Sequence, residues 1–449
     1  MNNSLISPRY AGELDPQFSQ MPEFPGWVDI LRALDWPVGR DLFFSSVAPT
    51  TDGHLYVCGY FAETVEHPVE YFITRLQEDG RRDITFGGDG YIRGTFPINF
   101  KMIIPTRVVV QTNGRILMQV LGYAGSLEAP DPVLLVARFM ASGEADQGFG
   151  EQGLMRMYLP AGKYYHLSPF AGDMQLLPDG RILASNNGMR PTPEGLKESA
   201  IVYRIKENGE LDATFNMSGL VDLAPAGGSL RVVQLLAQPD GKIVVAGYIT
   251  HQAAGHASGM FARLDNEGRL DTTFGPLGTG FFEFALEGYD LQVNSLVMRP
   301  NGSLVGVGTC SAVVPDRALD DQGFIMALTA EGSPDMTFNN GDLLITLINE
   351  RYSVEWIAAQ LQRDGKLLAA GRSHPLQVSY DTYIYLARYN PDGTPDITFG
   401  PSGTGLVETR VGGFNDLPME MRQQADDKIV IGVNAGSFRK GIVLRYLNG

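Results

Sequence analysis

The feature that most constrains the fold is a short motif, G-x-x-D-x-x-F, that returns along the whole chain. Six copies read GRRDITFG, GEADQGFG, GELDATFN, GRLDTTFG, GSPDMTFN and GTPDITFG, and begin at Gly80, Gly143, Gly209, Gly268, Gly332 and Gly393. A seventh copy, GELDPQF, begins at Gly12. Successive motif glycines, continued to Gly449, are 56 to 68 residues apart. Self-similarity at a fixed period predicts a repeat architecture of stacked supersecondary units.

A second motif alternates with the first and consists of a D-G or N-G pair between two apolar stretches. Examples are TTDGHLYVCG, QTNGRILMQV, LPDGRILASN, QPDGKIVVAG, RPNGSLVGVG and QRDGKLLAAG. Such pairs between apolar segments predict a tight β-hairpin, because both central residues of the turn need a positive φ. The seventh copy, QADDKIVIGV, has Asp427 in place of the glycine, so we expect this turn to be the most strained of the set.

Each unit therefore predicts four antiparallel strands, as in residues 232–238, 242–248, 259–265 and 280–286 of one repeat. Seven such units form an all-β, seven-bladed β-propeller. The chain ends at Gly449, which has the same place in the pattern as Gly12. We therefore expect the ring to close by an N-terminal fourth strand that pairs with the C-terminal blade. The prediction is one domain over residues 1–449, with an insertion of loop and helix at 19–41.

The motif residues are predicted to be structural. The aspartate accepts hydrogen bonds from backbone N–H groups two or three residues ahead. The phenylalanine points inward and anchors neighbouring blades. The aspartates are Asp15, Asp83, Asp146, Asp212, Asp271, Asp335 and Asp396, and the phenylalanines are Phe18, Phe86, Phe149, Phe215, Phe274, Phe338 and Phe399.

This pattern resembles the delta-60 repeat, a bacterial β-propeller repeat. The resemblance rests on sequences such as PDGTPDITFG and covers residues 11–449. It implies the fold, and it brings no agreed activity and no catalytic motif. The second unit departs most from the pattern, because Gly148 stands where the other copies have Thr or Gln.

Charge and composition exclude several partner classes. The net charge is −16 and no basic run occurs, which argues against nucleic acid as a partner. No stretch of 18 apolar residues and no signal-peptide pattern is visible, so we expect no membrane insertion. The expected location is the cytoplasm, or outside the cell by a signal-independent route. Two cysteines in dissimilar contexts do not predict a disulfide. We expect a monomer.

Binding residues are expected on the face that carries the loops of variable length, called here the variable-loop face. Its longest connection, Ser19–Asp41, carries Trp27 and Trp36. One interpretation is a short helix that plugs the ring or packs on neighbouring blades, and the other is an aromatic ledge for a sugar or a partner protein. The further binding candidates on this face are Tyr164, Tyr165, His166, Arg317, Tyr352 and Arg372.

The innermost strands supply a second set of candidates. Seven residues before each turn glycine the chain has Ser46, Arg107, Asp173, Gln234, Ser295, Ala358 and Glu420. The next position is apolar in every copy, which places the two sets on opposite faces of the strand. If the polar set faces the channel, Asp173, Glu420 and Arg107 are candidate catalytic residues for acid–base chemistry. The alternative interpretation is an ordinary polar, water-filled channel.

The sequence predicts no metal site and no cofactor. The six histidines lack ligand spacing, and no catalytic or nucleotide-binding motif is present. The segments FGGDG and FNNGD hint at calcium, but they lack a complete calcium loop and are explained by turn chemistry. Two hypotheses follow. The first is a non-enzymatic scaffold that binds a glycan or a protein on the variable-loop face. The second is a hydrolase or lyase with an acidic site at the channel mouth.

Overall fold

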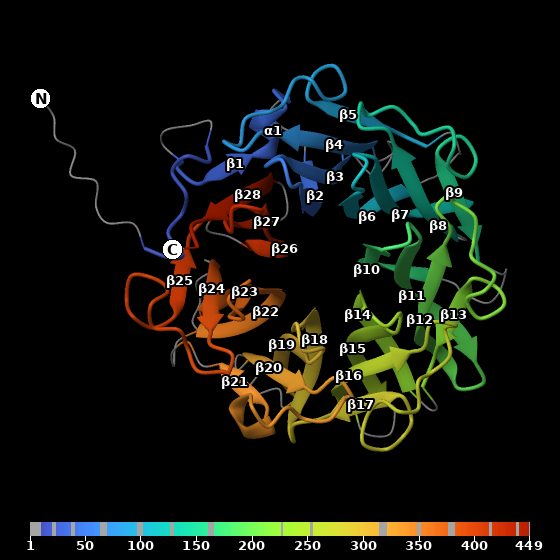
Figure 1. Ribbon diagram of the computed structural model, residues 1–449, viewed down its shortest axis with the longest axis vertical. Helices are drawn as coiled ribbons and strands as arrows, with labels where there is room; N and C mark the ends of the chain where they lie inside the picture. Colours follow the sequence, from blue (N-terminus) through green and yellow to red (C-terminus); the bar gives the residue numbers. More distant parts are fainter. Residues whose placement is uncertain are drawn as a thin grey trace, which may run out of the picture.

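The computed structural model describes residues 10–19, 24–36, 41–62, 70–96, 102–125, 130–159, 166–225, 228–251, 255–313, 321–346, 348, 352–375, 382–412, 415–436 and 440–448. In this part of the chain the strands form seven four-stranded antiparallel sheets, arranged radially as the blades of a ring (Figure 1). The predicted seven-bladed β-propeller is thus confirmed.

The first strand of each blade is innermost and the fourth is outermost. Blade 1 contains β2 (Asp41–Pro49), β3 (Leu55–Ala62), β4 (Glu70–Leu76) and β5 (Tyr91–Gly94), and blade 2 contains β6 (Met102–Val110), β7 (Ile116–Gly125), β8 (Pro130–Phe139) and β9 (Leu154–Tyr158). Blade 3 contains β10 (His166–Leu176), β11 (Ile182–Thr192), β12 (Gly195–Ile205) and β13 (Leu220–Leu223), and blade 4 contains β14 (Gly228–Ala237), β15 (Ile243–His251), β16 (Ala257–Leu264) and β17 (Phe281–Phe284). Blade 5 contains β18 (Tyr289–Met298), β19 (Leu304–Ala312), β20 (Gln322–Leu328) and β21 (Leu344–Thr346), with the short helix η2 (Asn339–Gly341) before β21. Blade 6 contains β22 (Tyr352–Leu361), β23 (Leu367–Pro375), β24 (Tyr383–Tyr389) and β25 (Leu406–Thr409). Blade 7 contains β26 (Leu417–Gln423), β27 (Ile429–Ala435), β28 (Lys440–Tyr446) and β1 (Trp27–Asp29).

The two ends of the chain share blade 7, as the split motif predicts. Strand β1 pairs antiparallel with β28, with Trp27 opposite Leu444 and Asp29 opposite Ile442. This outermost strand falls inside the 19–41 segment, and it is followed by a single helical turn, α1 (Ile30–Ala33). Ile30 and Ala33 are buried among residues of blades 1 and 7, so this segment packs on neighbouring blades.

The hairpin turns between the first two strands are found where predicted, but a positive φ occurs only at the second residue of each pair and not at the Asp or Asn before it, so the prediction for both residues was wrong. The turn glycines of blades 1 to 6 have φ between 80° and 88°, and Asp427 has φ 68°. For an L-residue other than glycine the left-handed region costs roughly 1–2 kcal/mol. The turn of blade 7 is therefore the one hairpin turn of this set in which a side chain bears that cost.

The motif residues join each blade to the next. In all seven copies the aspartate accepts a hydrogen bond from the backbone N–H two residues ahead, at 3.0–3.1 Å. Every motif phenylalanine is fully buried. Its ring lies against the motif glycine of the following blade, as Phe399 lies against Gly12, where a Cβ would come within 2.8 Å of the ring. The glycine is needed here both for its positive φ and for this close approach.

An arginine on the third strand completes this contact in six blades. Its guanidinium pairs with the motif aspartate and lies over the motif phenylalanine, with Cζ 4.4–5.4 Å from the ring centroid. The six residues are Arg75, Arg138, Arg204, Arg263, Arg388 and Arg445. Several of them also donate to a carbonyl of the next blade, as Arg204 does to Asn266 at 2.6 Å. We call each set of arginine, motif aspartate and motif phenylalanine an arginine staple.

Blade 5 builds the same contact from a different strand. Ala327 stands where the other blades have the arginine, and Arg299, directly after β18, pairs with Asp335 at 3.3 Å instead. Its guanidinium lies 5.3 Å from the Phe338 centroid and donates to the Pro391 carbonyl of blade 6. Blade 5 therefore also has an arginine at the motif aspartate and phenylalanine, although this arginine comes from a different position in the repeat.

Candidate functional site

The innermost strands of all seven blades are irregular at the same height. Each contains a register shift relative to the second strand, as between Val232 and Gln234 or between Val293 and Ser295. In six blades the shift adds one residue to the inner strand, which is a β-bulge, and in blade 3 it is longer. A bulge turns two successive side chains toward one side of the sheet. The channel is therefore lined by more residues than strict alternation predicts.

A glycine on the second strand accompanies the bulge in four blades. At Gly59, Gly247, Gly308 and Gly371 a Cβ would lie 1.9–2.0 Å from a carbonyl oxygen of the inner strand. A side chain at these positions would collide with the bulged backbone. Four of the seven hairpin motifs carry this glycine six residues after the turn, which is the one sequence signal for the bulge.

The positions predicted on the inner strands form a ring, called here the belt. Its members are Ser46, Arg107, Asp173, Gln234, Ser295, Ala358 and Glu420. Within the described residues, side-chain hydrogen bonds or an ion pair link its members from blade to blade, except between blades 6 and 7, where Ala358 has no polar side chain. A belt side chain typically accepts from the backbone N–H that follows the belt position in the next blade. Glu420 accepts from Val47 at 2.8 Å, Ser46 from Val108 at 3.1 Å and Asp173 from Leu235 at 3.1 Å. Gln234 accepts from Leu296 at 2.7 Å and Ser295 from Ala359 at 3.0 Å.

Arg107 interrupts this pattern, because a guanidinium has no acceptor. The Met174 N–H, which would have bonded to blade 2, is instead bound by the Asp173 carboxylate at 2.9 Å. Arg107 itself bridges the two belt carboxylates, at 2.7 Å to Asp173 and 2.5 Å to Glu420. The three residues that the sequence places at the channel do meet, and they meet as an ion-paired group.

The carboxylate of Glu420 is held in its charged form. Burial alone would raise its pKa, but Arg422, Arg107 and the Ser46 hydroxyl, which donates at 2.7 Å, lower the pKa below its ordinary value. A group with these partners stays ionised at neutral pH and has its lone pairs already occupied. It is poorly suited to give a proton to a substrate.

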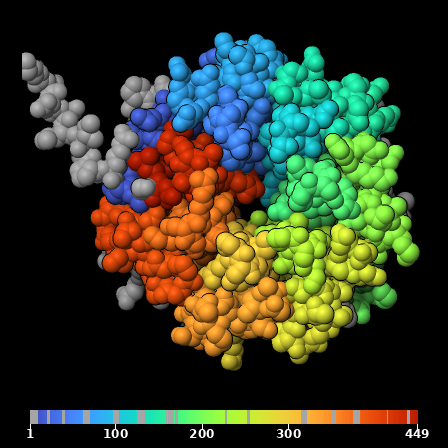
Figure 2. Space-filling view, in the orientation of Figure 1, coloured from blue at the N-terminus to red at the C-terminus, as the bar shows by residue number. Residues whose placement is uncertain are grey.

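A cavity of about 430 Å³ lies in the channel and includes belt residues in its wall. Figure 2 shows the ring hollowed at its centre. Leu417 and Pro418 line the cavity at the start of β26, and Ser311 lines it near the end of β19. First strands begin, and second strands end, at the variable-loop face. The cavity therefore lies on that side of the belt, and we call it the channel cavity.

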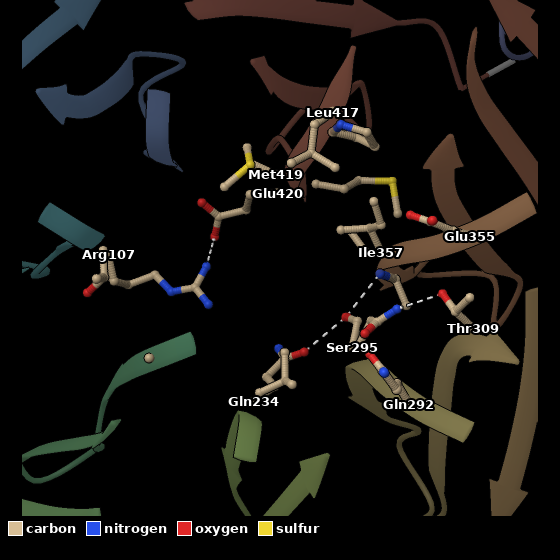
Figure 3. Close-up of a pocket in the computed structure, with 18 of the residues that line it drawn as sticks. Arg107, Gln234, Gln292, Ser295, Thr309, Glu355, Ile357, Leu417, Met419 and Glu420 are labelled. Atoms are coloured by element: carbon tan, nitrogen blue, oxygen red, sulfur yellow. Dashed lines mark hydrogen bonds and ion pairs between the residues drawn. The ribbon is translucent and has the colours of Figure 1, made fainter. Parts of the chain in front are cut away.

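The channel cavity has two unlike walls. Blades 4 and 5 contribute Arg231, Tyr248, Gln292, Asn294 and several hydroxyl and amide groups, which form the polar wall. Blades 6 and 7 contribute Ile357, Leu417, Pro418 and Met419, which we call the apolar wall, and beside them the charged residues Glu355, Glu420 and Arg422. In Figure 3 Leu417 and Met419 lie on the side opposite Gln234 and Gln292, with Arg107 between the two sides.

Several polar-wall groups have hydrogen-bonding capacity left over. Gln234 uses its side-chain oxygen in the belt, and Asn294 uses its nitrogen to donate to Thr309 and to the Trp356 carbonyl. Within the described residues, the other half of each amide and the Gln292 and Ser311 side chains make no hydrogen bond to the protein. The volume of the channel cavity is within the range of small-molecule sites.

The charges at the cavity are arranged in pairs. Arg231 is bound through its Nε by both oxygens of Glu198, at 2.9 and 3.0 Å, and its guanidinium lies 5.7 Å from the centroid of Tyr248. Glu355 accepts from Arg372 at 2.8 Å. The predicted binding residue Arg372 thus lies beside the cavity and is held by one of its lining residues.

The two tryptophans occupy different places. Trp27 is half-buried, contacts Phe24 edge to face, and lines a small apolar pocket of about 140 Å³ with Val411 and Ile442. Trp36 stacks on Phe61, at 4.2 Å between centroids, and lies under the guanidinium of Arg93. Trp27 packs on the core of blades 6 and 7 and Trp36 on that of blade 1. They line separate hollows and do not form one continuous ledge.

Other candidates fall outside what the structure describes. Tyr164, Tyr165 and Arg317 are not among the described residues, and neither are the side chains of His166 and Tyr352. The described residues contain no group of three or more His, Cys, Asp or Glu side chains that could hold a metal ion. None of the helices they form could span a bilayer.

Most residues of the cavity wall are not evident from the sequence pattern, including Arg231, Tyr248, Gln292, Asn294 and Ile357. These residues belong to the bulges or to positions beyond them, where the alternation of inward and outward side chains is broken. The glycines opposite the bulges were the available signal.

Comparison with known proteins supports the fold. A family model described as a domain of unknown function, DUF5122 beta-propeller, matches residues 238–274 and 362–399. Each segment runs from the hairpin turn of a blade to its motif phenylalanine. A search of curated proteins gives no match.

Among solved structures the chain is similar to the polysaccharide lyase Uly1. The identity is 10% and the TM-score 0.53, over 98% of this chain and 97% of that one. It is also similar to the β-propeller domain of the Trilobed protease from Pyrococcus furiosus, with 10% identity and a TM-score of 0.45, over 90% of this chain and 93% of that one. At such identity the likeness concerns the fold alone, and the family model supports a β-propeller family.

Proposed function

We propose that the protein is a non-enzymatic binding propeller that holds a glycan in the channel cavity, on its variable-loop face. The observation that carries this proposal is a cavity of about 430 Å³ whose polar wall offers unused amide and hydroxyl groups above a rigid belt. Sugars present many hydroxyl groups at fixed positions, and fixed donors and acceptors bind them without a large loss of side-chain entropy. We further propose that the repeats are delta-60 repeats, on the basis of the G-x-x-D-x-x-F motif.

The belt argues against the alternative of a hydrolase or lyase. Acid–base catalysis needs a group that can exchange a proton near neutral pH and can reach the substrate. Glu420 is ionised, 3% exposed and fully engaged by Arg107, Arg422, Ser46 and the Val47 N–H. Asp173 is 2% exposed and binds Arg107 and two backbone N–H groups. Both carboxylates are better explained as the groups that hold the inner strands together.

The pocket beside Trp27 is the other candidate for the glycan-binding site. It is on the same face, and a half-buried tryptophan is a suitable contact for a sugar ring or for an apolar side chain of a partner protein. Its volume of about 140 Å³ is too small to enclose a sugar unit with its hydroxyl groups, whereas the channel cavity is within the usual range for ligand sites.

The test is a glycan-array screen with the labelled protein and with two variants, Gln292→Ala and Trp27→Ala. Gln292 makes no hydrogen bond to the described protein, so its loss should leave the fold intact, which a thermal-unfolding curve checks. We expect binding to a defined set of glycans that weakens about tenfold, or roughly 1.4 kcal/mol, in Gln292→Ala and persists in Trp27→Ala.

The opposite pattern would move the site to the Trp27 pocket, and no binding by the wild-type protein would reject the proposal. Incubation of each bound glycan with the protein, followed by mass spectrometry, tests the alternative. Shortened or unsaturated products that disappear in Glu420→Gln would establish an enzyme.

A further inference from the structure

From the charge balance and the two walls of the channel cavity, we infer that its ligand is an uncharged sugar unit that carries a methyl group, as in a 6-deoxyhexose or an N-acetylhexosamine. The inference rests on the proposed glycan-binding function and specifies the chemistry of the ligand. Each step follows from the residues that line the cavity.

The charged side chains around the channel cavity are paired. Three arginines line the cavity, Arg107, Arg231 and Arg422, together with the carboxylates of Glu355 and Glu420. Their ion-pair partners are Asp173 for Arg107, Glu198 for Arg231 and Arg372 for Glu355. Counted with these partners, the described residues of the site hold four cations and four anions. Among these residues an acidic sugar would find no unpaired cation, and an amino sugar would find no unpaired anion.

Breaking one of these ion pairs would be costly. An anionic ligand that displaced a carboxylate from one of these arginines would leave unpaired a group that is itself largely buried, as Glu198 and Glu420 are. A displaced buried charge loses its partner without regaining water, and this costs several kcal/mol. Neutral hydroxyl groups avoid this cost, because they can bond to the paired groups and to the free amide atoms of Gln234 and Asn294 at the same time.

The apolar wall favours a ligand with a methyl group. Leu417 and Met419 lie across the cavity from Gln234 and Gln292 (Figure 3), and Ile357 and Pro418 also line the cavity. A fully hydroxylated hexose in contact with this wall would lose water from hydroxyl groups that find no partner. A sugar with a methyl group can direct that group to the wall and its hydroxyl groups to the other side. Burying one methyl group is worth roughly a fourfold gain in affinity.

The test compares sugars that differ in one group, with Kd measured by calorimetry or by ligand-observed NMR. The methyl-bearing members are N-acetylglucosamine and L-fucose, and their counterparts without the methyl group are N-formylglucosamine and L-galactose. Glucose is the neutral reference for glucuronic acid. Glucuronic acid tests for charge at low and high salt. We expect at least one methyl-bearing sugar to bind about fourfold or more tightly than its counterpart, and glucuronic acid to bind no better than glucose at either salt concentration.

A matched pair of variants links the preference to the wall. Ile357 and Val233 occupy the same bulge position in blades 6 and 4, and both line the cavity. Ile357→Thr should reduce the preference for the methyl-bearing sugar to less than twofold, whereas Val233→Thr, on the polar side, should leave it unchanged.

Equal affinity within each sugar pair, or tight and salt-sensitive binding of glucuronic acid, would overturn the inference while leaving glycan binding intact. An equal effect of the two variants would also overturn it. If none of these sugars binds and the array is also blank, the proposed function itself fails. The N-acetyl and the 6-deoxy arms separate the two sources of the methyl group.

Discussion

At the scale of single residues, the arginine staple explains how a repeat with few identical positions keeps one geometry. A buried aspartate, such as Asp212, accepts from the backbone N–H and the side-chain hydroxyl of Thr214 in its own turn and pairs with the guanidinium of Arg204, and that arginine covers the motif phenylalanine. Each residue satisfies or shields the next one. Loss of the arginine leaves a buried carboxylate without its main partner, which typically costs 3–5 kcal/mol.

Blade 5 allows this explanation to be tested. Arg299→Ala should lower the free energy of unfolding by about 3 kcal/mol, because Arg299 takes over the role of the missing third-strand arginine. Gln238 occupies the same position in blade 4, where Arg263 already binds the motif aspartate at 2.8 Å. Gln238→Ala is therefore the control and should cost less than 1 kcal/mol. Urea unfolding of both variants measures the difference, and equal losses would show that Arg299 is not part of a staple.

The strained turn of blade 7 gives a prediction of opposite sign. Asp427→Gly should raise the free energy of unfolding by about 0.5–1 kcal/mol, because glycine accepts φ 68° without steric cost. The change also removes the exposed ion pair with Arg363, which reduces the gain only slightly. The reverse change in blade 6, Gly365→Asp, should be destabilising by a similar amount. A less stable Asp427→Gly protein would show that the aspartate contributes more than strain.

The pKa directions predict how single carboxylates respond to acid. Burial alone would raise the pKa of Asp212, but hydrogen bonds from Thr214 and Arg181 and the charge of Arg204 lower it well below its ordinary value. The pKa values of Asp83, Asp146, Asp271 and Asp396 are lowered for similar reasons. A lowered pKa in the folded state means that the stabilisation is complete above the unfolded value, near 3.9, and is lost as the pH falls through the folded value.

Stability should therefore change little from pH 7 to about pH 5 and decrease steeply below about pH 4. In Asp212→Asn the protein should be less stable at pH 7 and the decrease below pH 4 should be shallower, because one titrating group is absent. Urea midpoints between pH 7 and pH 2.5 give both quantities. Parallel curves for the two proteins would contradict the assignment.

At the scale of the structural element, the inner strand combines two functions. Its belt residues hold neighbouring blades together, and its bulged residues line the channel cavity. The two sets are adjacent in the sequence, as Ser46 and Ser45 are in blade 1. Stability and binding can therefore be changed separately by substitutions one residue apart.

This separation is testable with those two serines. Ser46→Ala removes the hydroxyl that donates to Glu420 and accepts from the Val108 N–H, and it should cost about 1–3 kcal/mol. Ser45→Ala removes a half-buried hydroxyl of the cavity wall and should stay within about 0.5 kcal/mol of the wild type. Thermal and urea unfolding compare the two variants. If both changes are equally costly, the belt is not the structural ring described above.

The same strands show why the sequence predicts the fold better than the site. A turn such as that at Gly241 depends on a positive φ at one residue, so it can be predicted from the Asp-Gly pair alone. The set Ser46, Arg107, Asp173, Gln234, Ser295, Ala358 and Glu420 follows from counting back from those turns. Ile357 and Asn294 cannot be found in this way, because a bulge shifts the alternation and depends on backbone contacts between two strands. The pairing of Arg107 with Glu420, 313 residues away, requires the closed ring.

At the scale of the whole molecule, the ring is closed by the same contacts that join its internal blades. At the seam Arg445 pairs with Asp15, lies 4.4 Å from the Phe18 centroid and donates to the Glu78 carbonyl of blade 1. Residues from the two ends of the chain thus form one more arginine staple. The channel cavity needs this closure, since its walls include residues from blades 1 through 7.

The most direct test of the account is a crystal structure of the protein soaked with the glycan that binds best on the array. The account predicts electron density for the sugar in the channel cavity, with hydroxyl groups within hydrogen-bond distance of Gln292 and Asn294 and with the belt unchanged. Density at Trp27 with an empty channel cavity would contradict the account. So would a sugar that displaces Arg107 from Glu420 and Asp173, because the belt would then be part of a reactive site.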